Sequence, residues 1–418
     1  MTASETNPAV PATAVDSHRR THGALLLVGV LLIAANLRPT LTCVGPLIDV
    51  IRRSTGLSSA QAGVLNTLPL LAFAAVSGLA PRWARRFGFE PLLFAAVAAL
   101  FVGTLVRSVP STVALFGGTA LLGAGIACGN VLVPALIKRD YPARIPAMTA
   151  VYAVTLSSAA AISSGLAVPI ADTAPGGWRT ALDCWAVLSA IALAAWAPQL
   201  RARTRPVPVA RMTGLGRSAL AWQVTLFMGT QSFIFYCVVT WLPNILQDRG
   251  FSSSTAGWEL FLYQLVSLSA AATVPSVIRR LPDQRLVASV TSAAAVAAFV
   301  GLAFAPAVDT LWVVLGGLAS GAGLTLALSF FGLRAGDAAQ SSALSGMAQS
   351  IGYLIAASGP ILIGMLRDAT SQWRSALIVL AVVAVIQLGV GLGAGRAHTI
   401  TGSRRADTPV SERDSIED

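Results

Sequence analysis

The sequence predicts an all-α integral membrane protein with twelve transmembrane helices in two pseudo-symmetric six-helix bundles. Three observations lead to this prediction. The chain of 418 residues is 55% hydrophobic and only 11% charged, whereas a soluble domain carries roughly 25% charged residues. Apolar runs recur along the whole chain, and patterns in its first half reappear in its second half. A chain of this length has room for about twelve spans of roughly 20 apolar residues each.

The apolar runs predict where each span lies. Each run is interpreted as a helix, because a bilayer admits only helices or closed barrels and no run alternates as a barrel strand does. The first run is too long for the apolar region of a secretory signal, so it stays in the protein. The predicted spans are 24–47, 60–80, 91–107, 112–137, 146–170, 178–199, 220–245, 255–277, 286–305, 311–333, 342–366 and 374–395.

A polar stretch divides the chain nearly in half. It carries two prolines and five arginines and differs in composition from the runs on either side. The expected organisation is a tail over 1–22, a first bundle over 23–199, a linker over 200–219, a second bundle over 220–395 and a charged tail over 396–418. Both tails and the linker are expected in the cytoplasm.

The basic residues predict the orientation. If the chain begins inside, 21 of the 29 lysines and arginines fall in inner segments. Seven fall outside, namely Arg52, Arg53, Arg107, Arg179, Arg249, Arg367 and Arg374. Cytoplasmic loops carry such an excess of positive charge, so we expect a multi-pass protein of a bacterial plasma membrane with both termini cytoplasmic. Because these arginines lie between apolar runs, the net charge of +11 does not indicate a nucleic-acid partner.

Short repeats relate the two halves. Three pairs of segments match in the same order at separations of 194 to 199 residues: 56–63 with 250–257, 117–125 with 316–323, and 178–182 with 373–377. This separation contains six helices, an even number, so the two halves have the same orientation. Parallel six-helix repeats with a binding site between them are typical of transporters.

Arg38 is the most informative single residue. It lies about 14 residues into the first span, or roughly 21 Å at 1.5 Å per residue, and so deep a charge usually faces a cavity or a partner. Pro39 removes the backbone hydrogen bond to the carbonyl of Ala35, and an interrupted helix near the midplane points to a binding site. The guanidinium either holds an anionic or strongly polar solute or pairs with a buried carboxylate or helix-end carbonyls.

Other polar residues inside the spans are candidates for the same site. Glu259 is the candidate for proton coupling, since burial raises the pKa of a carboxyl group; alternatively it balances Arg38 or lies at the interface. A stripe in the seventh span indicates a water-filled path or interhelical hydrogen bonds; it comprises Ser232, Tyr236, Thr240 and Asn244. The predicted substrate-binding residues are Arg38, Asn130, Gln231, Tyr236, Glu259, Tyr263, Gln349 and Tyr353.

Enzyme and metal chemistry are not indicated. The three histidines, His18, His22 and His398, all fall in the tails, and the four cysteines form no C-x-x-C pair. We therefore expect no catalytic residue, no metal and no cofactor, and interpret the cysteines as packing residues. The glycine pairs lack the Lys-Ser/Thr of a phosphate loop, so close helix packing explains them better. A membrane-embedded enzyme and a transporter-like sensor are the alternatives.

Several segments resemble known transporters. The layout resembles the major facilitator superfamily, and residues 78–86 are similar to its signature between the second and third helices, although Pro81 and Ala84 replace the usual Asp and Gly. Within that superfamily, four stretches resemble the cyanate-permease and 2-nitroimidazole-exporter family: 36–46, 129–140, 241–243 and 347–360.

The resemblance implies a function. It implies a major facilitator fold and a monomeric secondary active transporter that moves a small polar or anionic, cyanate-like solute across the cytoplasmic membrane by alternating access. The alternative is a proton-coupled exporter of a small drug-like compound such as a nitroimidazole. The partners implied are the solute, the lipid bilayer and, for the exporter, protons.

Overall fold

The computed structural model describes residues 26–201, 215–336 and 338–400, and all regular structure in these ranges is helical. The first half holds a helical segment over 26–36, α2 (Pro39–Thr42), α3 (Val44–Thr55), α4 (Ser59–Phe87), α5 (Phe89–Arg107), α6 (Thr112–Asp140), α7 (Ile145–Thr173), α8 (Trp178–Asp183) and α9 (Trp185–Trp196). The second half holds α10 (Ala219–Gln247), α11 (Ser253–Ile278), α12 (Arg285–Phe304), α13 (Asp309–Leu333), α14 (Ala338–Thr370) and α15 (Trp373–Ala394).

The predicted number of spans is confirmed. Within the described ranges, eleven helical stretches are long and apolar enough to cross a bilayer, and the bent stretch from Leu26 to Thr55 makes twelve. That first span runs eight residues past its predicted end at 47 and stops where Gly56 adopts a left-handed conformation, with φ of 73°. The expected tail over 1–22 and residues 202–214 of the expected linker lie outside the described residues.

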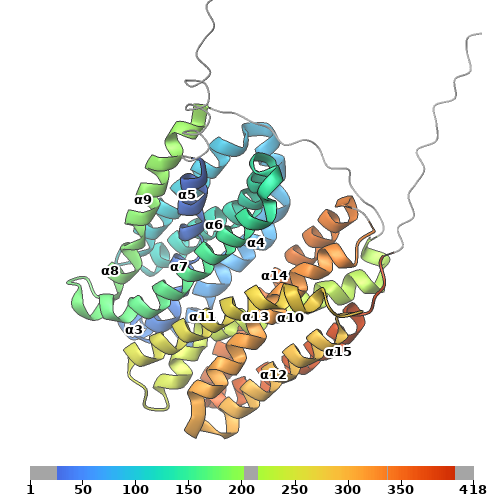
Figure 1. Cartoon of the computed structure of the whole chain (residues 1–418). Coiled ribbons are helices and arrows are strands. Elements are labelled where there is room, and N and C mark those ends of the chain that lie inside the picture. Colours follow the sequence, from blue (N-terminus) through green and yellow to red (C-terminus); the bar gives the residue numbers. More distant parts are fainter. Residues whose placement is uncertain (1–25, 202–214, 337, 401–418) are drawn as a thin grey trace, which may run out of the picture.

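The two halves lie side by side in Figure 1, with the blue-to-green helices of the first half beside the yellow-to-red helices of the second. Residues 26 and 400 lie at the same end of the molecule, which we call the termini end. The opposite end, formed by the loops at 56–58, 108–111, 174–177, 248–252, 305–308 and 371–372, is the far end. The halves contact each other mainly through α4 against α14 and through α7 against α11.

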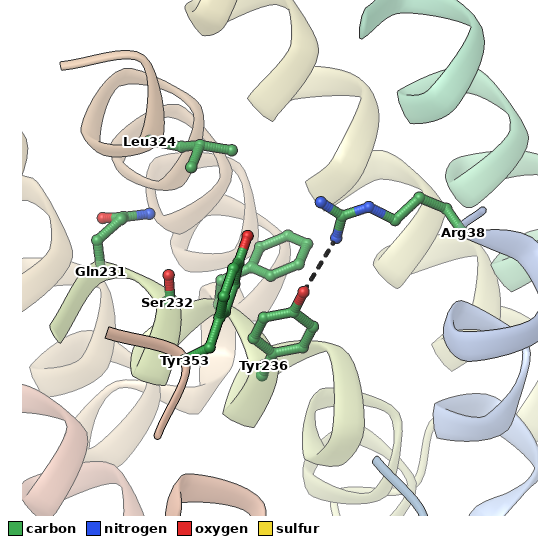
Figure 2. Close-up of a pocket in the computed structure, with 7 residues that line it drawn as sticks. Arg38, Gln231, Ser232, Tyr236, Leu324 and Tyr353 are labelled. Atoms are coloured by element: carbon green, nitrogen blue, oxygen red, sulfur yellow. Dashed lines mark hydrogen bonds between the residues drawn. The ribbon is translucent and has the colours of Figure 1, made fainter. Parts of the chain in front are cut away.

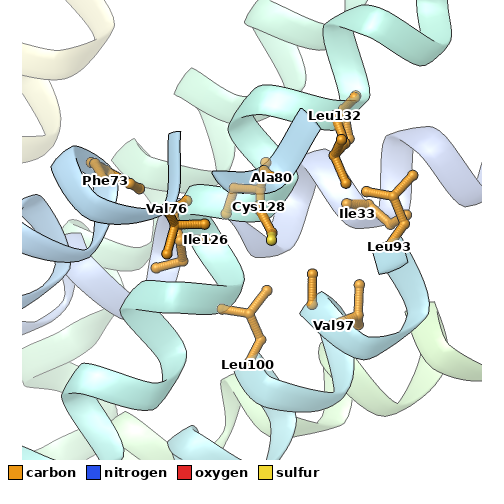
Figure 3. Close-up of a cluster of buried hydrophobic side chains, with 14 of the residues drawn as sticks. Ile33, Phe73, Val76, Ala80, Leu93, Val97, Leu100, Ile126, Cys128 and Leu132 are labelled. Atoms are coloured by element: carbon orange, nitrogen blue, oxygen red, sulfur yellow. The ribbon is translucent and has the colours of Figure 1, made fainter. Parts of the chain in front are cut away.

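An apolar core holds the first half together (Figure 3). Side chains from the first span and from α4, α5 and α6 meet there, and they include Ile33, Phe73, Leu93, Leu100 and Ile126. Cys128 is buried in the same cluster, and all four cysteines are free. Cys128 therefore acts as the packing residue that its surroundings predict.

Hydrogen bonds between the halves gather toward the far end. Asn66 on α4 donates to the Thr240 hydroxyl at 2.9 Å, and Thr67 donates to the carbonyl of Ala357 at 2.8 Å. The carboxylate of Asp368 on α14 accepts the backbone N–H groups of Ser59 and Ala60, at 3.1 and 2.9 Å. Asp368 thus binds the first turn of α4, where helix N–H groups lack partners of their own.

Glycines bring the two backbones together at the same end. A Cβ atom on Gly63 would lie 2.5 Å from the carbonyl oxygen of Pro360, and one on Gly364 would lie 2.5 Å from that of Ser59. A Cβ atom on Gly45 would likewise overlap the carbonyl oxygen of Val239. Gly45, Gly63 and Gly364, the far-end glycines, therefore let the halves approach more closely than any other residue type allows.

Two spans of the first half are broken. The first bends by 44° between Thr42 and Val44, and the sixth changes from α8 to α9 at Cys184. Arg107, at the end of α5, donates to the carbonyl of Thr40 at 2.6 Å and to that of Leu182 at 3.2 Å. Arg107 thus lies at the end of its span, as predicted, but its side chain turns inward to satisfy these carbonyls and is only 1% exposed.

We expect Arg107→Met to destabilise the fold. The variant leaves two buried carbonyls without this donor, and hydrogen bonds to a charged group contribute about 1.5–3 kcal/mol each. Thermal unfolding in detergent, followed by tryptophan fluorescence, should show a clearly lower midpoint. The matched control is Arg179→Met, because Arg179 stacks on Trp178 and is less buried; an equal loss in both variants would contradict the assignment.

Candidate solute-binding site

A small pocket lies between the two halves (Figure 2), with about 280 Å³ of space that includes its opening to solvent. The first span, α10, α13 and α14 supply its walls. The lining residues are Arg38, Gln231, Ser232, Phe235, Tyr236, Leu324 and Tyr353. The pocket therefore brings together four of the predicted binding residues from three separate parts of the sequence: Arg38, Gln231, Tyr236 and Tyr353.

Arg38 stands where the first span is interrupted. It precedes Pro39, the first residue of α2, and its side chain reaches across to the second half. One Nη donates to the hydroxyl of Tyr236 at 3.5 Å, a long hydrogen bond, and the guanidinium carbon lies 5.6 Å from the ring centre of Phe235. Such a cation over an aromatic face is attracted by the ring.

The charge of Arg38 has no ionic partner in the described part of the chain. No carboxylate there lies within 4.0 Å of the guanidinium, and its Nε is buried without an acceptor. Burying a cation without a counter-charge is costly. The alternative that Arg38 forms a structural ion pair is therefore not supported among these residues, and the cation is available to a solute.

One face of α10 forms much of the second wall. Gln231 and Ser232 lie one turn from Phe235 and Tyr236, so all four side chains face the same side of the helix. The residues of the predicted polar stripe make two different kinds of contact. Ser232 and Tyr236 line the pocket, whereas Thr240 bonds to Asn66 across the halves.

Asn130 on α6 lies behind the wall that the first half contributes. Asn130 does not line the pocket itself, but its side-chain oxygen accepts from the hydroxyl of Tyr152 on α7 at 3.3 Å. The preceding residue, Gly129, packs against Leu37, which is next to Arg38. Asn130 therefore lies behind the pocket wall.

Besides Asn130, three predicted residues lie outside the pocket. Glu259 accepts from the hydroxyl of Thr310 on α13 at 2.6 Å, and makes no contact with Arg38. Tyr263 packs against the glycine pair of α13, and Gln349 donates to Ser345 within its own helix at 2.8 Å. The proposed pairing of Glu259 with Arg38 is therefore absent, because Glu259 faces α13 within its own half.

Sequence reasoning did not identify Phe235, Leu324 or Tyr152. Phe235 and Leu324 are apolar residues in apolar spans, so nothing in their type distinguishes them from lipid-facing neighbours. Phe235 adjoins Tyr236 in the sequence, and that neighbour was the available signal. Tyr152 is one of only five tyrosines in the chain, and an aromatic hydroxyl inside a span usually has a polar partner.

Known proteins match this chain over most of its length. Residues 30–357 match the Major Facilitator Superfamily. The chain is 44% identical to a 2-nitroimidazole transporter of Escherichia coli (strain K12), covering 90% of this chain and 96% of that protein. It is 27% identical to the cyanate transport protein CynX of the same organism, covering 83% of this chain and 91% of CynX.

Solved structures share the fold. A bacterial homologue of the human lysosomal transporter Spinster, in an inward-facing and occupied conformation, superposes with a TM-score of 0.73 at 15% identity, covering 90% of this chain and 97% of that one. A D-xylose–proton symporter superposes with a TM-score of 0.71, also at 15% identity, covering 90% and 98%. At this identity the likeness concerns the arrangement of the helices.

Proposed function

The chain belongs to the Major Facilitator Superfamily, and on that premise we propose that it is a secondary active transporter that moves a small polar or anionic solute by alternating access. It is a multi-pass membrane transporter and not an enzyme. The observation that carries the proposal is Arg38, a cation without a counter-charge in a pocket between the two halves. A solute with negative charge would supply what the described residues around it lack.

The distribution of contacts supports alternating access. Asn66, Thr67 and Asp368 join the halves toward the far end, and the far-end glycines close the backbones there. If the positive-inside prediction holds, the far end faces outward and this conformation is closed to the outside. Transport would then require these contacts to separate while new ones form at the termini end.

Two solutes are the leading candidates. A cyanate-like anion suits the free guanidinium of Arg38. A nitroimidazole is the second candidate, because the 44% identical relative is a 2-nitroimidazole transporter and because the aromatic faces of Phe235, Tyr236 and Tyr353 line the same pocket. A flat ring can stack on such faces while its nitro oxygens accept from the guanidinium.

The alternative to uptake of an anion is export driven by protons. Glu259 stays the candidate for proton coupling, with one carboxylate oxygen bonded to Thr310 and the other buried without a partner. It lies outside the pocket, so coupling through Glu259 would act through the packing of α11 against α13. In this alternative the protein exports the nitroimidazole in exchange for protons.

The test is accumulation of labelled cyanate, and separately of 2-nitroimidazole, in cells with and without the protein. Each measurement is repeated with a protonophore. Protein-dependent accumulation of cyanate supports anion uptake, whereas depletion of the nitroimidazole that a protonophore abolishes supports a proton-driven exporter. If the protein changes the level of neither compound, both forms of the proposal are rejected.

We expect Tyr236→Phe to weaken binding of the solute without abolishing its transport. The hydroxyl accepts a long hydrogen bond from Arg38, and such a bond contributes about 0.5–1.5 kcal/mol, or roughly a 2-fold to 13-fold change in affinity. The KM for the transported solute should rise within this range at a nearly unchanged maximal rate. A fall in maximal rate at constant KM would instead place Tyr236 in the conformational change.

A further inference from the structure

A glutamine outside the pocket holds one of the residues that line it. Gln387 lies on α15, between apolar neighbours, and its side chain is 1% exposed. Its Nε2 donates to Oε1 of Gln231 at 3.1 Å. Gln231 lines the pocket, and its own Nε2 donates to the backbone carbonyl of Ser320 on α13 at 2.9 Å. A chain of two hydrogen bonds therefore runs from α15 through α10 to α13.

The carbonyl of Ser320 determines the direction of this chain. A backbone carbonyl can only accept a hydrogen bond, so the part of the Gln231 amide that faces it is the NH₂ group. The oxygen of Gln231 must then face Gln387, which has to present its own NH₂ group in turn. Exchanging the nitrogen and oxygen of Gln231 would place two acceptors against each other at Ser320.

This orientation decides what Gln231 offers to a solute. Its Nε2 carries two hydrogens, and only Ser320 accepts one of them among the described residues. Figure 2 shows the amide nitrogen of Gln231 directed toward the interior of the pocket and the oxygen directed away from it. Gly323 makes room for that oxygen, because a Cβ on residue 323 would overlap it.

We propose that Gln387 is a positioning residue that locks the amide of Gln231 so that the pocket offers an N–H donor on the side away from Arg38. Figure 2 places Gln231 and Arg38 on opposite sides of the pocket. The pocket thereby selects a solute with hydrogen-bond acceptors at two ends, one of them anionic or a nitro group bound by Arg38. The inference rests on the proposed function, since it takes this pocket as the solute site.

The first test needs no solute. Purified protein carrying Gln387→Met, Gln231→Met or both is melted in detergent. If Gln387 holds Gln231, the two losses overlap, and the double variant melts at nearly the same temperature as the less stable single variant. Losses that add fully would show that the two amides act independently, and this would overturn the positioning role.

The second test compares two probes that differ by one ring acceptor, 2-nitroimidazole and 2-nitropyrrole. Both carry the nitro group that Arg38 binds, but only 2-nitroimidazole has a ring nitrogen that can accept from the N–H of Gln231. The wild type should bind 2-nitroimidazole more tightly, and Gln387→Met should reduce that preference roughly 3-fold to 10-fold. A merely structural role would weaken both probes equally and leave their ratio unchanged, which would overturn the proposal.

The matched control is Gln223→Met. Gln223 is also on α10 and packs against α15 at Gly393, but it does not line the pocket, so its variant should keep the wild-type ratio. If the wild type binds neither probe, the solute class is overturned together with the nitroimidazole form of the proposed function. The melting experiment then still decides whether Gln387 positions Gln231.

Discussion

Arg38→Ala should abolish transport of the solute. The variant removes the pocket's cation, and with it charge-assisted hydrogen bonds of about 1.5–3 kcal/mol each. The loss of two such bonds corresponds to a fall in affinity of roughly 100-fold or more. Arg38→Lys should restore transport only in part, because an ammonium group keeps the charge but lacks the planar fork of donors. Uptake into proteoliposomes measures both effects.

The control for this result is Arg53→Ala. Arg53 belongs to the same span, but it is exposed at the far end, so its variant should transport at the wild-type rate. Both variants must elute from size exclusion as the wild type does, which separates loss of binding from loss of folding. Full transport by Arg38→Ala would remove Arg38 from the site and reject the anion form of the proposed function.

Gly63→Leu should arrest the protein with its far end open. The residue has no room beside the carbonyl of Pro360, and inserting extra carbons into such a contact costs about 1–3 kcal/mol or more. A cost of this size moves the balance between two conformations by roughly 5-fold to 150-fold. Transport should fall by at least the lower of these factors, because each cycle has to pass through the conformation closed at the far end.

Thiol labelling reports the conformation directly. Thr67→Cys lies one turn from Gly63 at the junction of the halves and is buried there, so a membrane-impermeant reagent should modify it faster when Gly63→Leu is also present. Gly346→Leu is the matched control, because Gly346 on α14 has open space beside it. Slow labelling together with normal transport in Gly63→Leu would contradict alternating access through this contact.

The number and order of the spans could be predicted because length and apolar character are properties of the sequence alone. The deep position of Arg38 followed from the same count of residues. The direction in which each side chain faces could not be predicted, because it depends on the rotation of every helix against its neighbours. Glu259, near the far-end start of α11, faces α13 instead of the pocket for this reason.

Arg107 illustrates a second limit of the sequence. At the end of an apolar run an arginine is expected to extend toward water, and a span boundary alone cannot show that the side chain turns inward. Two broken helices lie beside it, and each presents a carbonyl that accepts from its guanidinium. Those breaks depend on tertiary contacts of the first and sixth spans, which the composition of α5 does not reveal.

The broken spans have an evolutionary consequence. The first and sixth spans are divided, whereas their duplicated counterparts, α10 and α15, are continuous helices of 29 and 22 residues. The two copies thus differ in the continuity of their helices, and the two breaks of the first copy meet at Arg107, which donates to a carbonyl beside each. Rearrangement around a bound solute would then take place mainly in the first half, whose helices are broken, and the second half would move less.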